Sequence, residues 1–223
     1  MKLTIYPLLI SILFITQSAY AEMTPKTEKE KLSYSMGTFF AQTVIRQNID
    51  VDITAFLQAV EDVLNGKDPK IAMQEMQQLL TAYQQKEQEE QNAAAVKNQQ
   101  AGIEFLKKNK EKEGWKELES GLQYKVIKGG TGKSPATNDT ILVHYRGTFI
   151  DGSEFDSSYN RGEPIELAVN RVIPGWQEAL QLMKVGGKLQ IAVPSDLAYG
   201  QRGSDIIGPN SVLLFDIELI EIK

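Results

Sequence analysis

The chain contains no cysteine and only one histidine, His144. The absence of cysteine excludes disulfides, thiolate catalysis and cysteine metal sites, so the protein has to fold by packing alone. A single histidine excludes a metal site with several histidines, and a Ser/His/Asp triad could be built only around His144. Because His144 lies within a β-rich run, a structural role is favoured over a catalytic one. The sequence therefore predicts a function without metal or cofactor.

Positive charge is also scarce, with 24 Lys and Arg against 29 Asp and Glu and a formal net charge of −5. Nucleic-acid binding depends on neutralising phosphates with Lys and Arg. An acidic chain has no electrostatic reason to bind nucleic acid, so we expect no such partner.

Long hydrophobic runs are limited to residues 5–15, which fall short of the roughly 20 residues that cross a bilayer. Lys2 precedes this run, and the small-x-small pattern Ala19, Tyr20, Ala21 follows it. These features are typical of a signal peptide, residues 1–21, cleaved after Ala21, with a membrane anchor as the alternative. Cleavage removes Lys2 as the only charge and takes the net charge from −5 to −6. We expect an exported protein.

Two short motifs resemble ligand-binding loops without the residues that such loops need. "GGTGKS", residues 129–134, resembles a phosphate loop, but the pattern requires glycine where Ile127 stands, and Pro135 follows in place of a helix. "DGSEFDSS", residues 151–158, lacks several ligand positions and the sixth-position glycine of a calcium loop. We interpret the first motif as a turn and expect no calcium at the second.

Residues 22–114 are predicted to be almost entirely helical, because their apolar residues follow helical spacing. Helix starts are predicted at Thr24-Pro25, at the capping Asp52 and at Asp68-Pro69. The apolar positions of the first two helices are Leu32, Met36, Phe39, Phe40 and Val44, then Ile53, Phe56, Leu57, Val60 and Leu64. The third helix carries Met73, Met76, Leu79, Leu80 and Tyr83 on its apolar side.

The third helix continues into "QQKEQEEQNAAAVKNQQ", which has hardly any apolar face. A helix that is polar all round either bridges domains through solvent or is unstable, and this composition has high helix propensity. We interpret residues 84–117 as a stalk helix, with a disordered charged linker as the alternative. A helix from Pro69 to near Glu113 would span about 65 Å. Gly102 is a weak point in it.

The helical residues 22–83 are too few to form a stable core alone, so this segment is predicted to be a dimerisation domain. An intramolecular core is equally compatible with each apolar residue considered by itself. The residues expected at a dimer interface are Met36, Phe39, Phe40, Met73 and Met76.

The pattern of residues 118–223 predicts an antiparallel sheet with one short helix, which belongs to the α+β class. "LQYKVI", "ILVHYRGTFI", "LQIAV" and the alternating end of the chain are the predicted strands. The helix lies in "VIPGWQEAL", where Trp176, Ala179, Leu180 and Met183 form one apolar stripe. Apolar residues also stand in glycine-rich loops, Tyr199 in "AYGQRG" and Ile206 and Ile207 in "SDIIGPN", where they cover a core edge or line a pocket.

The blocks "VHYRG", "GSEFDSS", "VIPGWQEAL", "AYG" and "IGPNSVLLFDIEL" resemble an FKBP-type peptidyl-prolyl cis/trans isomerase across residues 118–223. With the helical first half and the signal peptide, the chain is similar to the macrophage infectivity potentiator group of exported bacterial isomerases. This resemblance implies a five-stranded antiparallel sheet wrapped around the short helix. It also implies a homodimer through residues 22–83, two catalytic domains held apart by long helices, and a location in the periplasm or at the outer membrane or cell surface.

The resemblance also implies a binding site for proline in the hollow between sheet and helix. Trp176 would form its floor, and Tyr145, Phe155, Val172, Ile173 and Phe215 its walls. The N–H of Ile173 and the hydroxyl of Tyr199 would bind ligand carbonyls, with Asp156 at the rim and Arg161 as its partner. The implied substrate-binding residues also include Arg161, Ile165 and, from the neighbouring loop, Ile206 and Ile207. The implied catalytic residues are Asp156, Tyr199, Tyr145 and Phe155.

Two positions depart from the family. Ile165 stands where phenylalanine is frequent, and the loop after Tyr199 is one residue shorter than in the small human prototype, with Ser204 in place of histidine. Both differences concern ligand preference and rate.

The implied activity is rotation about X-Pro bonds in folding polypeptides, by desolvation and binding of a twisted amide in an aromatic pocket. Macrolides such as rapamycin would compete for the same pocket. The alternative is a non-catalytic holding chaperone that uses the cleft between two arms of a dimer.

Overall fold

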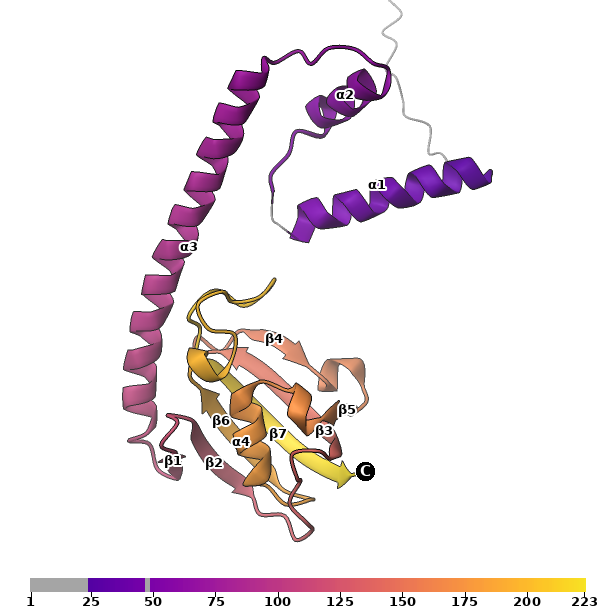
Figure 1. The fold of residues 1–223 in the computed structure, drawn as a ribbon. Coiled ribbons are helices and arrows are strands. Elements are labelled where there is room, and N and C mark those ends of the chain that lie inside the picture. The colour runs from indigo at the N-terminus through magenta and orange to yellow at the C-terminus, as the bar shows by residue number, and fades with distance from the viewer. Residues whose placement is uncertain (1–23, 47–48) are drawn as a thin grey trace, which may run out of the picture. The chain divides into compact units, whose positions relative to one another are not determined.

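The computed structural model describes residues 24–46 and 49–223 (Figure 1). The predicted signal peptide, residues 1–21, lies outside the described residues. The chain divides into two compact units, Met1–Val51 and Asp52–Lys223. Within the described residues, no helix has both the length and the apolar character that a membrane span requires.

The first unit contains helix α1, Glu28–Arg46. The helix begins three residues later than the predicted start, because Thr27 and Glu30 form a capping box. Thr27 Oγ1 accepts a hydrogen bond from the Glu30 N–H at 3.2 Å, and Glu30 Oε2 accepts one from the Thr27 N–H at 2.9 Å. Leu32, Met36 and Phe39 are more than 60% exposed, so the predicted apolar face is not buried.

Helix α2, Ile53–Leu64, begins where the sequence predicts. Asp52 is its N-cap, since the Asp52 carboxylate accepts a hydrogen bond from the Ala55 N–H at 2.9 Å. Beyond the helix, Lys67 and Lys70 form ion pairs with the buried Asp62 at 3.3 and 3.1 Å. These contacts organise the segment that connects α2 to the next helix.

Helix α3 is continuous over Met73–Asn109, so the polar segment is helical, but both predicted ends were wrong. Its start at Asp68-Pro69 is displaced to Met73 because residues 67–72 form the non-helical connection that Lys67 and Lys70 tie to Asp62. The helix ends at Asn109, whose buried side chain donates a hydrogen bond to Gln123 at 3.0 Å. Thirty-seven residues span about 55 Å instead of 65 Å.

The remaining chain forms one antiparallel sheet in the order β1-β2-β6-β7-β3-β4, and β5 also pairs with β3. The strands are β1 Trp115–Glu117, β2 Gln123–Lys128, β3 Thr140–Phe149, β4 Glu154–Ser157, β5 Ile165–Ala168, β6 Lys188–Val193 and β7 Leu213–Ile222. The sheet therefore has seven strands where the resemblance implied five. Four longer strands, β2, β3, β6 and β7, form the centre of the sheet, and the short strands β1, β4 and β5 pair with them and bring the count to seven.

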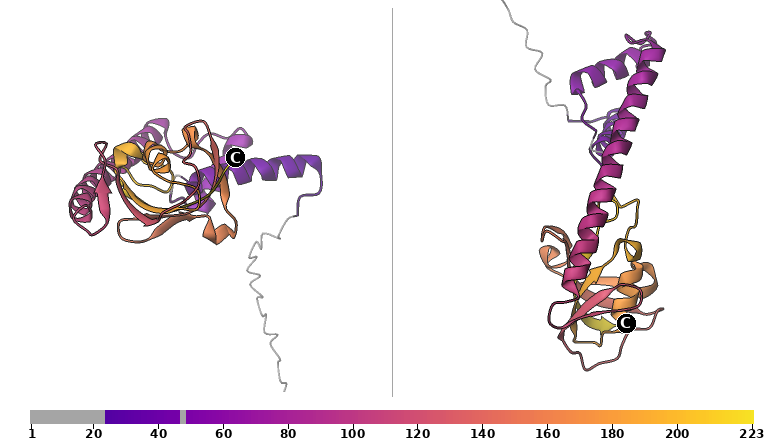
Figure 2. Two further views of the ribbon diagram at one scale, coloured as in Figure 1. Left: turned by 90° about the horizontal axis from the view of Figure 1, so that it is seen from below. Right: turned by 90° about the vertical axis from the view of Figure 1, so that its left-hand side faces the viewer.

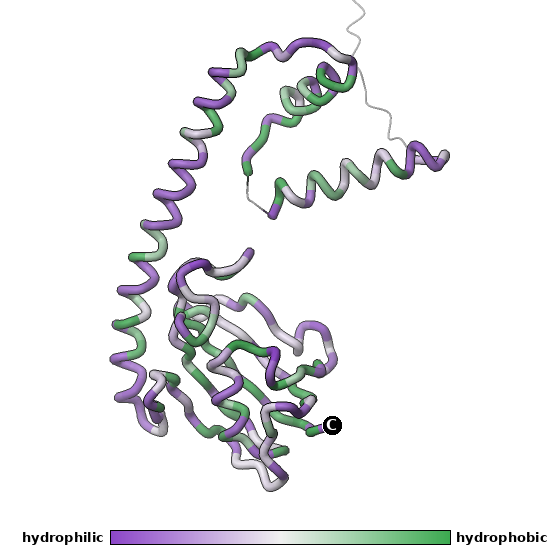
Figure 3. Tube along the Cα trace, in the orientation of Figure 1, coloured by the Kyte–Doolittle hydropathy of each residue, from purple (hydrophilic) through white to green (hydrophobic). Residues whose placement is uncertain are grey.

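The core lies between this sheet and helix α4, Pro174–Gln181, around which the long strands curve (Figures 1 and 2). Figure 3 shows hydrophobic residues in the strands of the sheet and along α2, whereas α3 is hydrophilic along most of its length. The predicted stripe of Trp176, Ala179, Leu180 and Met183 is buried. Its burial against β3, β6 and β7 fixes the orientation of α4.

Candidate active site

The N-terminus of α4 places Trp176 at the edge of the core. Pro174 occupies the first helical position, and Ile173 precedes it in an extended conformation with ψ of 150°. A Cβ on Gly175 would lie 2.5 Å from Val193 Cγ1, so the glycine lets this turn approach β6 closely. Trp176 is 4% exposed.

Four aromatic rings pack edge to face around this position. The Trp176 ring centroid lies 5.5 Å from that of Tyr145 and 5.3 Å from that of Phe215, with interplanar angles of 81° and 88°. Phe155 meets Phe215 at 5.6 Å and 90°. Gly147 lacks a side chain where Phe155 and Phe215 approach β3, which leaves room for both rings. Edge-to-face contacts of this kind are a favoured arrangement of aromatic pairs and stabilise the cluster by about 0.5–1.5 kcal/mol for each pair.

These rings border an open cavity of about 330 Å³, within the usual range for ligand sites. It is lined by Tyr145, Phe155, Asp156, Ile165, Leu167, Arg171, Val172, Ile173, Trp176, Tyr199 and Phe215. Nine of these residues were singled out from the sequence. Leu167 and Arg171 were missed, although Arg171 directly precedes Val172 and Leu167 lies two residues after Ile165 on the same strand.

Three predicted site residues lie elsewhere. Arg161 is not in the lining but contacts two residues of the rim. Ile207 is 3% exposed and belongs to the core, whereas Ile206 is 63% exposed and points away from it. Neither isoleucine lines the cavity, because the loop turns between them.

Tyr145, Asp156 and Arg161 form a closed triangle of hydrogen bonds at the rim. The Tyr145 hydroxyl donates to Asp156 Oδ2. Arg161 donates from Nη1 to Asp156 Oδ1 at 2.7 Å and from Nη2 to the Tyr145 hydroxyl oxygen at 2.8 Å. The predicted pairing of Arg161 with Asp156 is therefore present. The triangle holds the carboxylate at the mouth of an otherwise apolar cavity.

The protonation states of the rim follow from these contacts. Burial by itself would raise the pKa of Asp156, but hydrogen bonds from Tyr145 and Arg161 outweigh it and hold the pKa below its ordinary value of 3.8. Burial and the hydrogen bond to Asp156 raise the pKa of Tyr145 above 10.0. At neutral pH, Asp156 is therefore a carboxylate and Tyr145 a protonated donor.

Two residues that line the cavity carry donors with no acceptor in the described part of the chain. Neither the backbone N–H of Ile173 nor the hydroxyl of Tyr199 makes a hydrogen bond there. Tyr199 is 43% exposed at the cavity mouth. An apolar cavity with two unused donors at its edge fits a ligand that combines an apolar ring with carbonyl groups.

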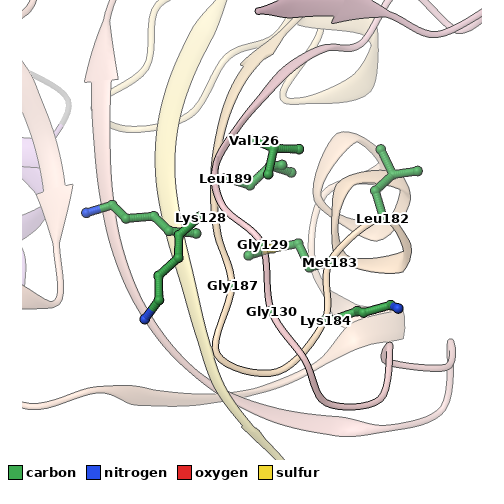
Figure 4. Close-up of a pocket in the computed structure, with 10 residues that line it drawn as sticks. Val126, Lys128, Gly129, Gly130, Leu182, Met183, Lys184, Gly187 and Leu189 are labelled. Atoms are coloured by element: carbon green, nitrogen blue, oxygen red, sulfur yellow. The ribbon is translucent and has the colours of Figure 1, made fainter.

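A second hollow, of about 270 Å³, lies near the turn that was compared with a phosphate loop (Figure 4). Its walls carry Lys128, Lys184 and Lys188, and in Figure 4 the lysine side chains extend toward different sides. The N–H groups of Thr131 and Gly132 both donate to the carbonyl of Val185 at 3.2 Å. These donors are therefore engaged within the protein, as expected of a turn.

His144 has structural contacts only. Its Nδ1 lies 3.0 Å from Ser158 Oγ, and its ring stacks on that of Tyr159 with centroids 4.6 Å apart. Ser158 is fully buried and also accepts a hydrogen bond from the Tyr145 N–H at 2.8 Å. His144 thus secures the end of β4 against β3.

Comparisons with known proteins show the family to which the chain belongs. A family model described as FKBP-type peptidyl-prolyl cis-trans isomerase matches residues 131–220, and one described as the domain amino terminal to it matches residues 29–126. The chain is 41% identical to the peptidyl-prolyl cis-trans isomerase Mip of Coxiella burnetii, over 100% of this chain and 99% of that protein. The chain belongs to the FKBP-type peptidyl-prolyl isomerase family.

Other FKBP-type relatives match most of the chain as well. The outer membrane protein MIP of Legionella longbeachae is 42% identical, over 88% of this chain and 87% of that one. The crystal structure of FkpA from Escherichia coli superposes with a TM-score of 0.64 at 36% identity, covering 90% of this chain and 99% of that chain. The FKBP-type fold predicted from the sequence motifs is therefore confirmed.

Proposed function

We propose that the aromatic cavity is the catalytic centre of a peptidyl-prolyl cis/trans isomerase that acts on proline-containing polypeptides. The single observation that carries this assignment is a cavity with an apolar floor at Trp176, two unused hydrogen-bond donors and a carboxylate fixed at its rim. A proline ring fits the apolar part. The carbonyl groups on either side of it match the donors of Ile173 and Tyr199.

The chemistry requires rotation about one bond, with no covalent step. Amide resonance gives a barrier of about 18–20 kcal/mol, and X-Pro bonds exchange over tens to hundreds of seconds. A twisted amide has lost resonance and is less polar than a planar one. An apolar cavity that disfavours the planar dipole and binds the twisted form lowers the barrier by differential binding. A millionfold acceleration corresponds to about 8 kcal/mol.

The rim supplies charge at a defined place. Arg161 neutralises part of the Asp156 carboxylate and keeps it oriented, so the remaining negative potential faces the carbon of the twisted carbonyl. Tyr145 remains protonated and holds the second carboxylate oxygen. In this arrangement Asp156 stabilises the charge that develops as the amide loses resonance.

The test is the cis-to-trans relaxation rate of a short Leu-Pro peptide, with and without rapamycin. Tyr199→Phe removes one donor and is expected to lower kcat/KM about three- to tenfold, which corresponds to about 0.7 to 1.4 kcal/mol for one hydrogen bond. Tyr159→Phe is the matched control, since Tyr159 is also 43% exposed but lies outside the cavity. Equal effects of the two substitutions, or a rate that rapamycin leaves unchanged, would rule out the assignment.

We also propose that the helical segment 22–83 forms a homodimer. Leu32, Met36 and Phe39 on α1 are 64%, 66% and 71% exposed, and Ile53, Val63 and Leu64 on α2 are 67%, 64% and 81% exposed. Helices that expose this much apolar surface need a partner surface. A second copy of the same segment satisfies both copies at once.

The same exposed apolar residues favour a second activity, the holding of unfolded chains. A Trp176→Ala/Asp156→Ala variant separates the two functions. Loss of aggregation suppression together with isomerase activity would assign both to the cavity. Full suppression of aggregation by an inactive variant would place holding on the helical segment.

Export is part of this proposal. The charged start, apolar run and small-residue motif of residues 1–21 support it, as does the similarity to a relative named outer membrane protein MIP. Fractionation of cells that express the full chain, with protease added to intact cells, distinguishes the periplasm from the cell surface. An uncleaved protein in the cytoplasm would contradict the proposal.

A further inference from the structure

The C-terminal half of α3 contacts the loop that carries Tyr199. Asn98 Nδ2 donates to the carbonyl of Pro209 at 2.9 Å and to Ser211 Oγ at 3.4 Å. In the opposite direction, Asn210 Nδ2 donates to the carbonyl of Ala95 at 3.4 Å. These bonds join segments 111 to 115 residues apart in the sequence. They connect a helix that looks uniformly polar to a specific place in the catalytic domain.

Close packing accompanies these hydrogen bonds. A Cβ on Gly102 would lie 2.7 Å from Val212 Cγ2, and Val212 is 6% exposed. Ala95, Asn98 and Gly102 are three and four positions apart, so they lie on one face of α3. In Figures 1 and 2 this half of the helix runs along the sheet domain. This face of α3 therefore contacts the loop through small residues, which allow close approach, and through an amide donor. Large hydrophobic side chains are not involved in these contacts.

The loop transmits this contact to Tyr199 through its backbone. The Asn210 N–H donates to the carbonyl of Gly200 at 2.9 Å, and Gly200 directly follows Tyr199. Asn210 has φ of 55°, in the left-handed region. No other non-glycine residue in the described ranges has a positive φ. Such a conformation persists where its surroundings hold it. Here the side-chain bond to α3 and the backbone bond to Gly200 hold it from both sides.

We propose that Asn98 and Asn210 are positioning residues, through which α3 holds the loop of residues 198–212 so that Tyr199 lies at the cavity mouth. The Tyr199 hydroxyl has no partner of its own in the described chain, so its place depends on the backbone that carries it. The stalk is then a part of the active-site scaffold in addition to a spacer. This inference rests on the proposed role of Tyr199 as a donor to the substrate.

The test uses the full mature chain with Asn98→Ala and Asn210→Gly. Alanine keeps the helix propensity of α3, and glycine tolerates the left-handed φ of position 210, so each change removes mainly the amide contact. Asn92→Ala is the matched control. Asn92 lies on the same helix, is exposed, and accepts a hydrogen bond only from Gln88.

Two readouts are expected to change together. For the Leu-Pro peptide, kcat/KM falls about three- to tenfold in Asn98→Ala and Asn210→Gly, the range for one or two hydrogen bonds, mainly through a higher KM. Amide hydrogen exchange in residues 198–212 becomes faster in both variants. Asn92→Ala leaves both readouts at the level of the unchanged protein. Faster exchange with unchanged kcat/KM, or no change in either, would overturn the inference.

A double-mutant cycle separates this inference from the assignment of Tyr199. In a Tyr199→Phe background, Asn98→Ala is expected to have no further effect on kcat/KM, because both changes remove the same contact to the substrate. Additive losses would show that Asn98 acts by another route. An unchanged kcat/KM in Tyr199→Phe alone would refute the role of Tyr199, whereas unchanged loop exchange in Asn98→Ala would refute the anchoring by α3.

Discussion

At the scale of single residues, the rim of the cavity depends on three side chains that satisfy one another. Tyr145 and Arg161 both donate to Asp156, and Arg161 also donates to Tyr145. Removing one member leaves the others with unused polar atoms beside an apolar cavity, which costs free energy. The arrangement therefore makes the stability of the fold depend on the residues of the proposed catalytic site.

The lowered pKa of Asp156 predicts an acid-dependent contribution to stability. A carboxyl whose folded pKa lies below its unfolded value stabilises the fold above the unfolded value and loses this contribution as pH falls through the folded pKa. The unfolded value is near 3.8, so the contribution is full at pH 7 and declines below about pH 4. Urea unfolding of the protein and of Asp156→Asn should differ more at pH 7 than at pH 3.

The pH dependence of this difference is the informative quantity. A difference of constant size from pH 7 to pH 3 would mean that Asp156 does not titrate with a lowered pKa. Tyr145 behaves in the opposite sense, because its raised pKa stabilises the fold below pH 10 and the contribution is lost at higher pH.

At the scale of elements, α3 contains two kinds of surface. Its middle is exposed and polar, while the face with Asn98, Gly102 and Asn109 contacts the catalytic domain. Leu106 contributes through its backbone carbonyl, which accepts a hydrogen bond from Gln123 at 2.9 Å. Gly102, which looked like a weak point of the helix, is the place of closest approach.

This placement of Gly102 predicts the outcome of Gly102→Ala. In an exposed helix the change would stabilise by up to about 1 kcal/mol. Here the added Cβ would lie 2.7 Å from Val212 Cγ2, so we expect destabilisation of the second unit instead. Denaturant unfolding checks this, and Val212→Ala in the same chain should relieve the clash.

Gly37→Ala in α1 is the matched control. Within the described residues of one chain, no atom lies within 4 Å of a Cβ built at Gly37, so in the Met36→Glu background, where the proposed dimer is absent, this substitution should show the ordinary helix-propensity gain. A stabilising Gly102→Ala would mean that α3 does not pack against Val212 in solution.

At the scale of the whole molecule, the proposed dimer and the catalytic domain have separate tasks. Peptide isomerisation needs one cavity, whereas a long unfolded client can contact two. Linking two cavities through their helices raises the effective concentration of the second cavity near a bound client. The benefit of dimerisation should therefore appear with protein clients only.

Met36→Glu tests this separation. A charge in the centre of the proposed interface is expected to give a monomer in sedimentation experiments, because a buried unpaired charge is costly. We expect kcat/KM for the peptide to remain unchanged per cavity, while the rate of proline-limited refolding of a protein client falls several-fold. Gln42→Glu adds the same charge at an exposed polar position of α1 and should remain dimeric. A Met36→Glu variant that stays dimeric would exclude this face as the interface.

The fold class could be predicted from the residues alone, and the resemblance of five sequence blocks to the FKBP-type family added nine of the residues that line the cavity. The spacing of apolar residues indicates which side chains of a helix are buried. The apolar stripe of α4 and the position of α2 could therefore be predicted from spacing alone. The spacing in "VIPGWQEAL" predicted that Trp176 faces inward, and the resemblance to the FKBP-type family implied its place at the floor of the cavity.

The tertiary structure alone decided the polar contacts and the ends of elements. The start of α3 depends on ion pairs between Asp62 and two lysines beyond its helix, and its end depends on a hydrogen bond from Asn109 to Gln123. Ile206 and Ile207 are identical in type, and only the course of the loop turns one outward and the other into the core. Asn98 and Pro209 meet across 111 residues. Hydrogen bonds between distant segments leave no periodic pattern, because they are made by single residues whose partners are set by the fold.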